Sequence, residues 1–211
     1  MLAQCVKCGN HKWNKKVKDN RITCPNCGYS WTFNKLPLFI LTGCSGIGKT
    51  TTAHELMLST TDIVVLDADF FFNIMPHETQ EDYLQQIEKL EDLSKNIMQA
   101  GKPVLWAMAG NLDKLNNVYN RQFYSAIFCL ALVCDEETLR HRMVQGRGIT
   151  DEQWIQSSIQ YNNYFKTHTA INDMPFDVCD TEGKKLDEVV EDVKKWVTGK
   201  MMRRRDEQYC I

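Results

Sequence analysis

Short apolar runs alternate along most of the chain with segments of helical periodicity. The apolar runs are Leu36–Thr42, Ile63–Leu66, Lys102–Ala109, Tyr124–Val133 and Asp177–Cys179. Parallel strands that are buried on both faces have this continuous pattern. Apolar residues at helical spacing predict helices over Lys49–Ser59, Glu81–Ala100, Glu136–Gly146, Glu152–Thr167 and Leu186–Val197. The alternation predicts an α/β fold built on a parallel sheet.

The first apolar run ends in a phosphate-binding sequence. Residues 43–50 read GCSGIGKT, which is the GxxxxGK[ST] pattern of a P-loop. Glycines allow a tight turn that points backbone N–H groups at phosphate oxygens, and the following helix adds its positive dipole end. This pattern requires a strand before it and a helix after it, and both are predicted. We therefore expect a nucleoside triphosphate to bind here.

The P-loop pattern also assigns roles to individual residues. Lys49 should reach the β- and γ-phosphates of ATP, and the Thr50 hydroxyl should bind Mg²⁺. The residues expected to contact the nucleotide are Gly43, Ser45, Gly46, Ile47, Gly48, Lys49, Thr50 and Thr51.

Two carboxylates follow the second predicted strand. Asp67 and Asp69 lie at its carboxyl end, which in open α/β sheets is the end where ligands bind. At strand spacing they would share a face. One carboxylate could organise Mg²⁺ through water while the other accepts the proton of a substrate hydroxyl. The alternative is a helix N-cap and a turn residue.

Three further side chains are candidates for substrate binding. Phe70 begins a run of three aromatic residues that could stack on a flat base, although such residues are commonly part of the core. Asn111 follows the third strand and could contact a sugar hydroxyl or base edge, but it could equally serve a turn. Arg121 could meet substrate or a transferring phosphoryl group, or could be solvated.

A group of arginines follows the fourth predicted strand. Planar guanidinium groups stack on adenine and form paired hydrogen bonds with phosphate. Arg142 and Arg147 are therefore expected to close over bound nucleotide as a lid that excludes water. Arg140 could instead pair with Glu136 or Glu137 at helical spacing.

The amino-terminal segment has the spacing of a four-cysteine metal site. Two Cys-x2-Cys pairs, separated by 15 residues, supply Cys5, Cys8, Cys24 and Cys27. This spacing is typical of a zinc ribbon, and a glycine follows each pair where the turn closes. Trp13, Val17 and Ile22 would form a hairpin, and Trp31 and Phe33 a third strand. A redox role is disfavoured because the motif occurs twice and outside a βαβ unit.

Charge is distributed unevenly between this ribbon and the remainder. Residues 1–34 carry a net charge of +5, so the rest carries −7 of the total of −2. A basic ribbon bearing aromatic residues could bind nucleic acid or dock a protein. It could also be an appendage whose lysines provide solubility and whose stability comes from the metal.

Length and composition bound the other possibilities. The chain of 211 residues has room for one main domain and a small appendage, and we expect a ribbon at 1–34, a P-loop domain at 35–199 and a flexible tail at 200–211. No apolar run is long enough to span a bilayer, and no signal peptide is evident. The nine cysteines then favour the reducing cytoplasm over disulfides.

Taken together, these motifs resemble the P-loop kinases of small molecules, including nucleoside and nucleotide kinases and their gluconate, shikimate and adenylylsulfate relatives. The resemblance covers residues 36–197 and rests on the P-loop, Asp67-x-Asp69 and the arginine lid; within the group, LDADFF, MAGNL and LALVCDEETL look most like bacterial nucleoside kinases. It implies a five-stranded parallel sheet in the order 2-3-1-4-5, MgATP as phosphoryl donor, and Asp69 near the acceptor hydroxyl. The ribbon departs from the family, where zinc, when present, lies inside the lid.

Three functions remain open at this point. The first is a kinase that phosphorylates a small hydroxyl acceptor, a nucleoside or nucleoside monophosphate. The second is a polynucleotide 5′-hydroxyl kinase that uses the ribbon to bind nucleic acid. The third is a non-catalytic regulatory module that uses ATP as a switch.

Overall fold

A parallel β-sheet forms the centre of the molecule. The computed structural model describes residues 2–12 and 14–209, so that Trp13, predicted to lie in the ribbon hairpin, falls outside the described residues. The five parallel strands are β4 (Leu38–Thr42), β5 (Val64–Asp67), β6 (Val104–Ala107), β7 (Ile127–Val133) and β9 (Met174–Asp180). They lie in the order β5-β6-β4-β7-β9, which is the predicted order 2-3-1-4-5.

The sheet nevertheless has six strands, and the prediction of five is corrected here. A two-residue strand, β8 (Ala170–Ile171), pairs antiparallel with the start of β9 at the edge of the sheet. The hairpin turn between them contains Asn172 in a left-handed conformation, with φ of 52°. A strand of two residues has no periodicity to detect, so the sequence pattern missed it.

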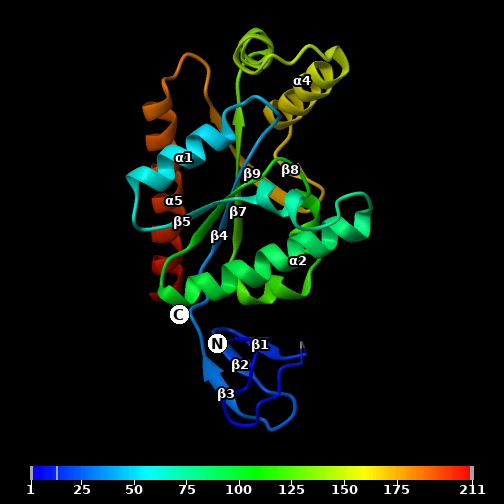
Figure 1. The fold of residues 1–211 in the computed structure, drawn as a ribbon. Helices are drawn as coiled ribbons and strands as arrows, with labels where there is room; N and C mark the ends of the chain where they lie inside the picture. The colour runs from blue at the N-terminus through cyan, green and yellow to red at the C-terminus, as the bar shows by residue number, and fades with distance from the viewer. Residues whose placement is uncertain (1, 13, 210–211) are drawn as a thin grey trace.

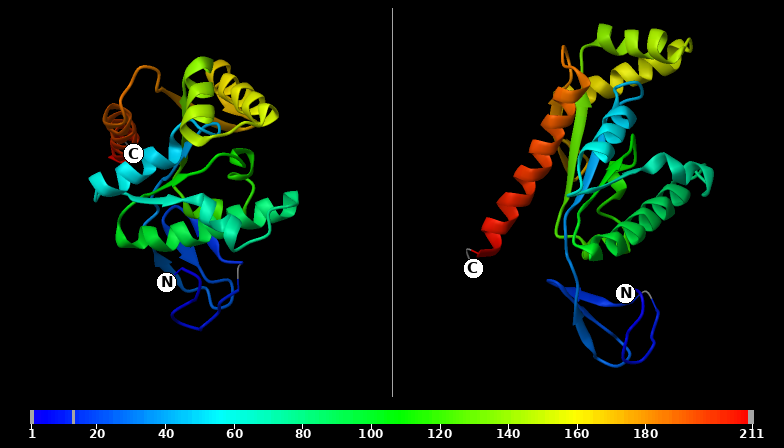
Figure 2. Two further views of the ribbon diagram at one scale, coloured as in Figure 1. Left: turned by 45° about the horizontal axis from the view of Figure 1, so that its top comes forward. Right: turned by 60° about the vertical axis from the view of Figure 1, so that its left-hand side comes forward.

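Helices cover both faces of the sheet, giving three layers (Figure 1). They are α1 (Lys49–Ser59), α2 (Gln80–Ile97), α3 (Glu136–His141), α4 (Glu152–Thr167) and α5 (Leu186–Tyr209). In β4, Phe39 and Leu41 face a core shared with α1 and α5, whereas Leu38 and Ile40 face a second core shared with α2. The right-hand view of Figure 2 shows α5 and α2 on opposite sides of the strands. Continuous apolar strands thus supply both cores.

Three helix boundaries differ from the prediction. Helix α2 ends at Ile97 and continues as a 3-10 turn, and α3 ends at His141 and continues as a single π turn over Arg142–Gly146. Helix α5 runs to Tyr209, so it continues past the predicted end at Val197 into the segment that was expected to be a flexible tail. Lys, Met, Arg, Glu and Gln favour helix strongly, and they continue α5 beyond its apolar stripe.

The amino-terminal segment forms a separate small sheet. Its antiparallel strands are β1 (Lys16–Lys18), β2 (Arg21–Thr23) and β3 (Ser30–Thr32). We call residues 2–34, without Trp13, the ribbon. Figure 1 shows it at the amino ends of the parallel strands, whereas the loop between β4 and α1 lies at their carboxyl ends. The two ends of the sheet therefore carry different structures.

The ribbon is attached by apolar packing and hydrogen bonds. Leu2, Ile22 and Phe33 form a buried cluster that is completed by Phe123 from the larger domain. The backbone N–H of Asn34 donates to the side chain of Gln99, and the amide side chain of each residue donates to the other's carbonyl group. These contacts fix the ribbon against the 3-10 turns that follow α2 and precede β7.

Replacing Asn162 by alanine should destabilise the fold. Its buried side chain in α4 accepts from the backbone N–H of Cys134 at 3.2 Å and donates to the carbonyl of Cys134 at 2.8 Å, which holds the end of β7. Asn162→Ala leaves a buried N–H without its partner, so the free energy of unfolding in urea should fall by about 1–3 kcal/mol. Asn163→Ala, on the exposed side of the same helix, is the control. Equal stability of both variants would contradict the prediction.

Candidate functional site

The loop between β4 and α1 depends on glycines at positions where a side chain would collide. Gly43 has φ of 136°, and a Cβ there would lie 2.7 Å from the carbonyl oxygen of Leu132 in β7. Gly46 has φ of 80°, and its Cβ would lie 2.6 Å from Cγ of Met143. Gly48, with φ of 112°, precedes the first turn of α1. The loop is therefore packed against β7 and the π turn, with its backbone shaped as a phosphate cradle.

Lys49 lies inside this loop. Its Nζ donates to the carbonyl oxygens of Gly43 at 3.0 Å and Cys44 at 2.9 Å. Burial lowers the pKa of Lys49, and the carboxylates of Asp69 and Asp67 act in the opposite direction. The ammonium group is thus held at the loop, at a position from which it can exchange backbone carbonyls for phosphate oxygens.

The fold brings Asp67 and Asp69 to the carboxyl end of β5, where both carboxylates influence Lys49 electrostatically. Asp67 is the last residue of β5 and Asp69 lies in the 3-10 turn Ala68–Asn73, so the two do not share a strand face. The backbone N–H of Asp69 donates to Oδ1 of Asp67 at 3.0 Å, so Asp67 also has the turn role that was the predicted alternative. Burial and the charge of Asp67 raise the pKa of Asp69, whereas Lys49 and Arg147 lower it.

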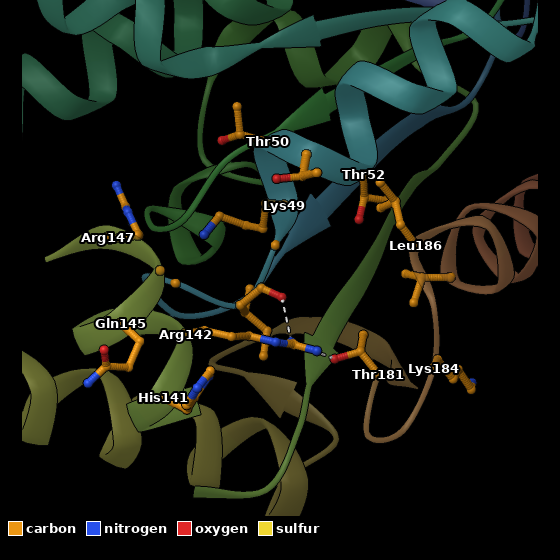
Figure 3. Close-up of a pocket in the computed structure, with 16 residues that line it drawn as sticks. Lys49, Thr50, Thr52, His141, Arg142, Gln145, Arg147, Thr181, Lys184 and Leu186 are labelled. Atoms are coloured by element: carbon orange, nitrogen blue, oxygen red, sulfur yellow. Dashed lines mark hydrogen bonds between the residues drawn. The ribbon is translucent and has the colours of Figure 1, made fainter. Parts of the chain in front are cut away.

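Both predicted lid arginines contact the phosphate loop, and Figure 3 shows the contacts of Arg142. Arg142 donates through Nη1 to the carbonyl of Ile47 at 3.2 Å and to Oγ1 of Thr181 at 3.1 Å. Arg147 donates to Oγ of Ser45 at 3.1 Å. Because Met143 also packs against Gly46, the π turn and the loop form one unit.

Arg140 has a different partner from the one expected. Its guanidinium forms a paired hydrogen bond with the carboxylate of Glu152 in α4, at 3.0 and 2.8 Å, rather than with Glu136 or Glu137. The contact joins α3 to α4 across a turn, which helical spacing within one segment could not reveal.

A large pocket lies beside the loop. It has a volume of about 750 Å³ and is bounded by residues 46–52, the π turn and the segment after β9. Thr181, Lys184, Leu186 and Val189 form the wall contributed by that last segment. The sequence prediction did not include them. Their position after the carboxyl end of a parallel strand was the available signal.

A much smaller cavity lies on the other side of Asp69. Its volume is about 50 Å³, and Asp69 and Asn111 line it together with Gln86, Ile87 and Leu90 of α2. Asn111 has a positive φ of 63°, so it also has the turn geometry that was its predicted alternative. Phe70 is 40 % exposed, and its ring stacks on Trp106 with centroids 6.1 Å apart.

Arg121 does not join these residues, and its predicted substrate role is corrected. It precedes β7 and therefore lies at the amino ends of the strands, opposite the phosphate loop. Its Nε donates to Asn116 at 3.0 Å and Nη1 donates to the carbonyl of Tyr124 at 3.2 Å. The guanidinium group fixes the turn before β7.

The four ribbon cysteines converge on one point. Their sulfur atoms lie within 4.8 Å of one another, with Cys5 and Cys27 3.8 Å apart and Cys8 and Cys24 3.7 Å apart. Sulfurs that bind zinc tetrahedrally at about 2.3 Å are separated by about 3.8 Å. In each pair the backbone N–H of the glycine four residues after the first cysteine, Gly9 or Gly28, donates to the carbonyl of that cysteine at 2.9 Å. The two turns are equivalent, and the four thiols could hold one metal ion.

Known structures share the fold at low sequence identity. A sugar kinase from Janibacter sp. HTCC2649 matches with a TM-score of 0.58 and 21 % identity over 78 % of this chain and 95 % of that chain. A tunicamycin resistance protein from Deinococcus radiodurans matches with 0.56 and 15 % identity over 77 % and 95 % of the two chains. For a gluconokinase from Sinorhizobium meliloti 1021 the values are 0.50, 15 %, 75 % and 89 %. At these identities the likeness establishes an α/β P-loop kinase-like fold.

The sequence comparisons add the family. No curated protein matches the chain. No helix in the described part of the chain is long and apolar enough to cross a bilayer. The family model described as "AAA domain" matches residues 38–155, from the strand before the phosphate loop to the start of α4. Because this match spans more than half of the 211 residues, the protein belongs to the AAA domain family.

Proposed function

We propose that the protein is an ATP-dependent phosphotransferase that moves the γ-phosphoryl group to a hydroxyl of a small molecule. The observation that carries this proposal is the convergence of Lys49, Asp69 and Arg147. Lys49 and Arg147 both contact the phosphate loop, and both cations act to lower the pKa of Asp69. A cradle, two cations and a carboxylate at one point are the parts that phosphoryl transfer needs.

Each group has a distinct task in this reaction. Lys49 and the loop N–H groups neutralise the phosphates, and Arg147 stabilises the charge that develops on the transferred group. Asp69 accepts the proton of the acceptor hydroxyl. Thr50 would hold Mg²⁺ with Asp67 acting through water, and the ion would supply further charge neutralisation. Arg142 positions the loop, because it binds the carbonyl of Ile47.

The large pocket is the proposed site of the nucleoside part of ATP. It extends from the loop to Thr181, Lys184 and Leu186, and Thr51 lines it at the start of α1. Arg142 forms one wall and is tied to Thr181, so the π turn and the segment after β9 are joined across the pocket. This arrangement would exclude water on one side of the phosphates.

The surface around the small cavity between Asp69 and Asn111 is the proposed acceptor site; at about 50 Å³ the cavity itself would take only the reacting end of the acceptor. A nucleoside or nucleoside monophosphate is supported by the exposed ring of Phe70 near Asp69, which offers a stacking surface. A sugar or sugar acid is supported by the names of two of the structural neighbours, a sugar kinase and a gluconokinase. The acceptor hydroxyl would have to lie beside Asp69 in either case.

The other two functions are less well supported. The ribbon lies at the amino ends of the strands and the phosphate loop at their carboxyl ends, so a polynucleotide held on the ribbon would have to pass along the larger domain before its end met Lys49 (Figure 1). A regulatory module would need the loop and a mobile element, but it would not need Asp69 beside a second cavity. Both alternatives can be tested together with the main proposal.

Release of ADP from MgATP should rise with one class of acceptor. The panel is nucleosides, nucleoside monophosphates, gluconate, other sugars, shikimate and a 5′-hydroxyl oligonucleotide, measured with a coupled ADP assay. In the presence of the best acceptor, Lys49→Ala should reduce kcat/KM by roughly a hundredfold or more, because it removes a preorganised charge on the phosphates. Lys102→Ala, an exposed lysine, is the control. Full activity of Lys49→Ala, or nucleotide binding without transfer to any acceptor, would contradict the proposal.

Asp69→Asn should lower kcat with little change in KM for ATP. The amide cannot take a proton from the acceptor, and general-base catalysis contributes roughly 10²–10⁴-fold to rate. Steady-state kinetics at saturating acceptor measure the effect. The exposed Asp62 provides the matched control, Asp62→Asn, which should leave kcat unchanged. If Asp69→Asn instead changes only KM for the acceptor, the carboxylate binds substrate and is not the base.

We also propose that residues 1–34 form a zinc ribbon, with Cys5, Cys8, Cys24 and Cys27 as ligands, joined to a P-loop domain that begins at residue 35. Purified protein should hold one zinc per chain by metal analysis. Cys24→Ser should lose the metal and lower the melting temperature of the ribbon, because a segment this small depends on metal for stability. Cys179→Ala removes a buried cysteine of the larger domain and should retain zinc. Unchanged zinc content in Cys24→Ser would exclude this ligand set.

A further inference from the structure

The carbonyl group of Ala109 joins three elements at the carboxyl end of the sheet. Ala109 follows β6, and its oxygen accepts a hydrogen bond from Oη of Tyr161 in α4 at 3.1 Å. The same oxygen accepts a second hydrogen bond from Oγ1 of Thr42 at 3.3 Å. Thr42 is the last residue of β4 and immediately precedes the phosphate loop. One carbonyl therefore connects α4 with the strand that leads into the loop.

Ala109 is also part of the small cavity beside Asp69. Ala109, Gly110 and Asn111 all line this cavity, and we call these three residues the cavity wall. Their side chains contribute little packing, because Ala109 is exposed and a Cβ at Gly110 would meet no atom within 4 Å. The backbone then turns sharply at Asn111, which has a φ of 63°. The hydrogen bonds to the carbonyl of Ala109 therefore decide where the wall lies.

Tyr161 is itself held in a fixed place. Its ring packs against Phe165, with centroids 4.6 Å apart, and contacts both cores of the sheet. The next residue, Asn162, ties α4 to the end of β7 through its two hydrogen bonds with the backbone of Cys134. Burial raises the pKa of Tyr161 to about 12, so its hydroxyl group stays protonated at neutral pH and donates to the wall.

Helix α4 is joined to the arginine segment as well. It follows the π turn Arg142–Gly146, and the paired hydrogen bond of Arg140 with Glu152 fixes its first turn to α3. The same helix thus contacts the elements that surround the phosphates and the wall of the small cavity. Transfer requires the two reacting groups to be aligned, and a displacement of about 1 Å can cost roughly a hundredfold in rate.

We propose that Tyr161 is a positioning residue of the phosphoryl-transfer site, whose hydroxyl group holds the cavity wall in place relative to the phosphate loop. This inference rests on the proposed function, because it takes the small cavity as the place where the reacting end of the acceptor lies. Tyr161 neither accepts a proton from the acceptor nor binds the nucleotide. A tyrosine that only stabilised α4 would affect the use of ATP and of the acceptor alike.

Amide hydrogen exchange, followed by mass spectrometry on the full-length protein, tests the structural part of the proposal. The peptide spanning residues 107–117 contains two hydrogen-bonded amides that flank the wall. That of Met108 donates to Leu41 at 3.0 Å, and that of Lys114 donates to Asn111 at 3.1 Å. Tyr161→Phe removes the hydroxyl group and keeps the ring, so exchange in this peptide should become about threefold to tenfold faster, the effect of one lost hydrogen bond.

The matched control is Tyr164→Phe. Tyr164 lies one turn further along α4, and its hydroxyl group donates to the backbone carbonyl of Ala170 in β8 at 2.8 Å. The control therefore removes the same kind of hydrogen bond from the same helix, but it leaves the contact with the cavity wall intact. Exchange in the peptide 107–117 should be the same in Tyr164→Phe as in the wild-type protein.

Steady-state kinetics with the best acceptor test the role in the reaction. In Tyr161→Phe, kcat/KM for the acceptor should fall by about threefold to tenfold. KM for ATP should not change, because the phosphate loop and the large pocket keep their contacts. The pH dependence of kcat should keep its shape, because the tyrosine does not exchange a proton with the acceptor. Tyr164→Phe should match the wild-type protein in all of these measurements.

The outcomes separate this inference from the proposed function. Unchanged exchange in Tyr161→Phe, or faster exchange with unchanged kcat/KM for the acceptor, would overturn the inference. Equal losses for ATP and for the acceptor would also overturn it, because the hydroxyl group would then only stabilise α4. If the wild-type protein transfers phosphate to no acceptor, the proposed function fails, and the exchange measurement alone decides whether Tyr161 holds the wall.

Discussion

The close approach of the phosphate loop to its neighbours is the constraint on which the site depends. A loop that presents backbone N–H groups to phosphate must curl so tightly that Gly43 touches the backbone of β7 and Gly46 touches Met143. A Cβ at either position would separate these layers. Since Met143 belongs to the same π turn as Arg142, packing of the loop also places the arginine that binds Ile47. The cradle and the arginine segment are positioned by one set of contacts.

The polarity of parallel strands explains why the candidate functional residues lie together at the carboxyl ends of the strands. The loop after β4, Asp67 at the end of β5 and Asp69 just after it, Asn111 after β6 and Thr181 after β9 all lie at the carboxyl ends of strands. The turns that precede the strands lie at the amino ends. There Arg121 fixes the turn before β7, and Phe123 packs against the ribbon. Position in the sequence relative to a strand therefore decides whether a polar residue can reach the nucleotide.

The polarity of the strands also explains which features could be predicted from the sequence and which could not. The order of the five parallel strands agrees with expectation. Arg142 and Arg147, which the sequence proposed as lid residues, contact the loop. Arg121 was misplaced because the segment between two parallel strands runs from the carboxyl end of one strand to the amino end of the next. The sequence alone does not show at which end a polar residue of that segment lies. Thr181 was missed because its contribution is a single hydroxyl held to β7 and Arg142 by the fold. Strand β8 is too short to have a pattern.

The ribbon must be stabilised in a different way from the larger domain. With about thirty residues it cannot bury enough apolar surface to be stable alone, and metal or a partner must compensate. The structure provides for both, because four thiols meet at one point and Phe123 completes the cluster of Leu2, Ile22 and Phe33. One face of the three-stranded sheet is used by this attachment, so charged residues are confined to the other. The concentration of cations on a single exposed face thus follows from the way in which a small sheet is held to a larger one.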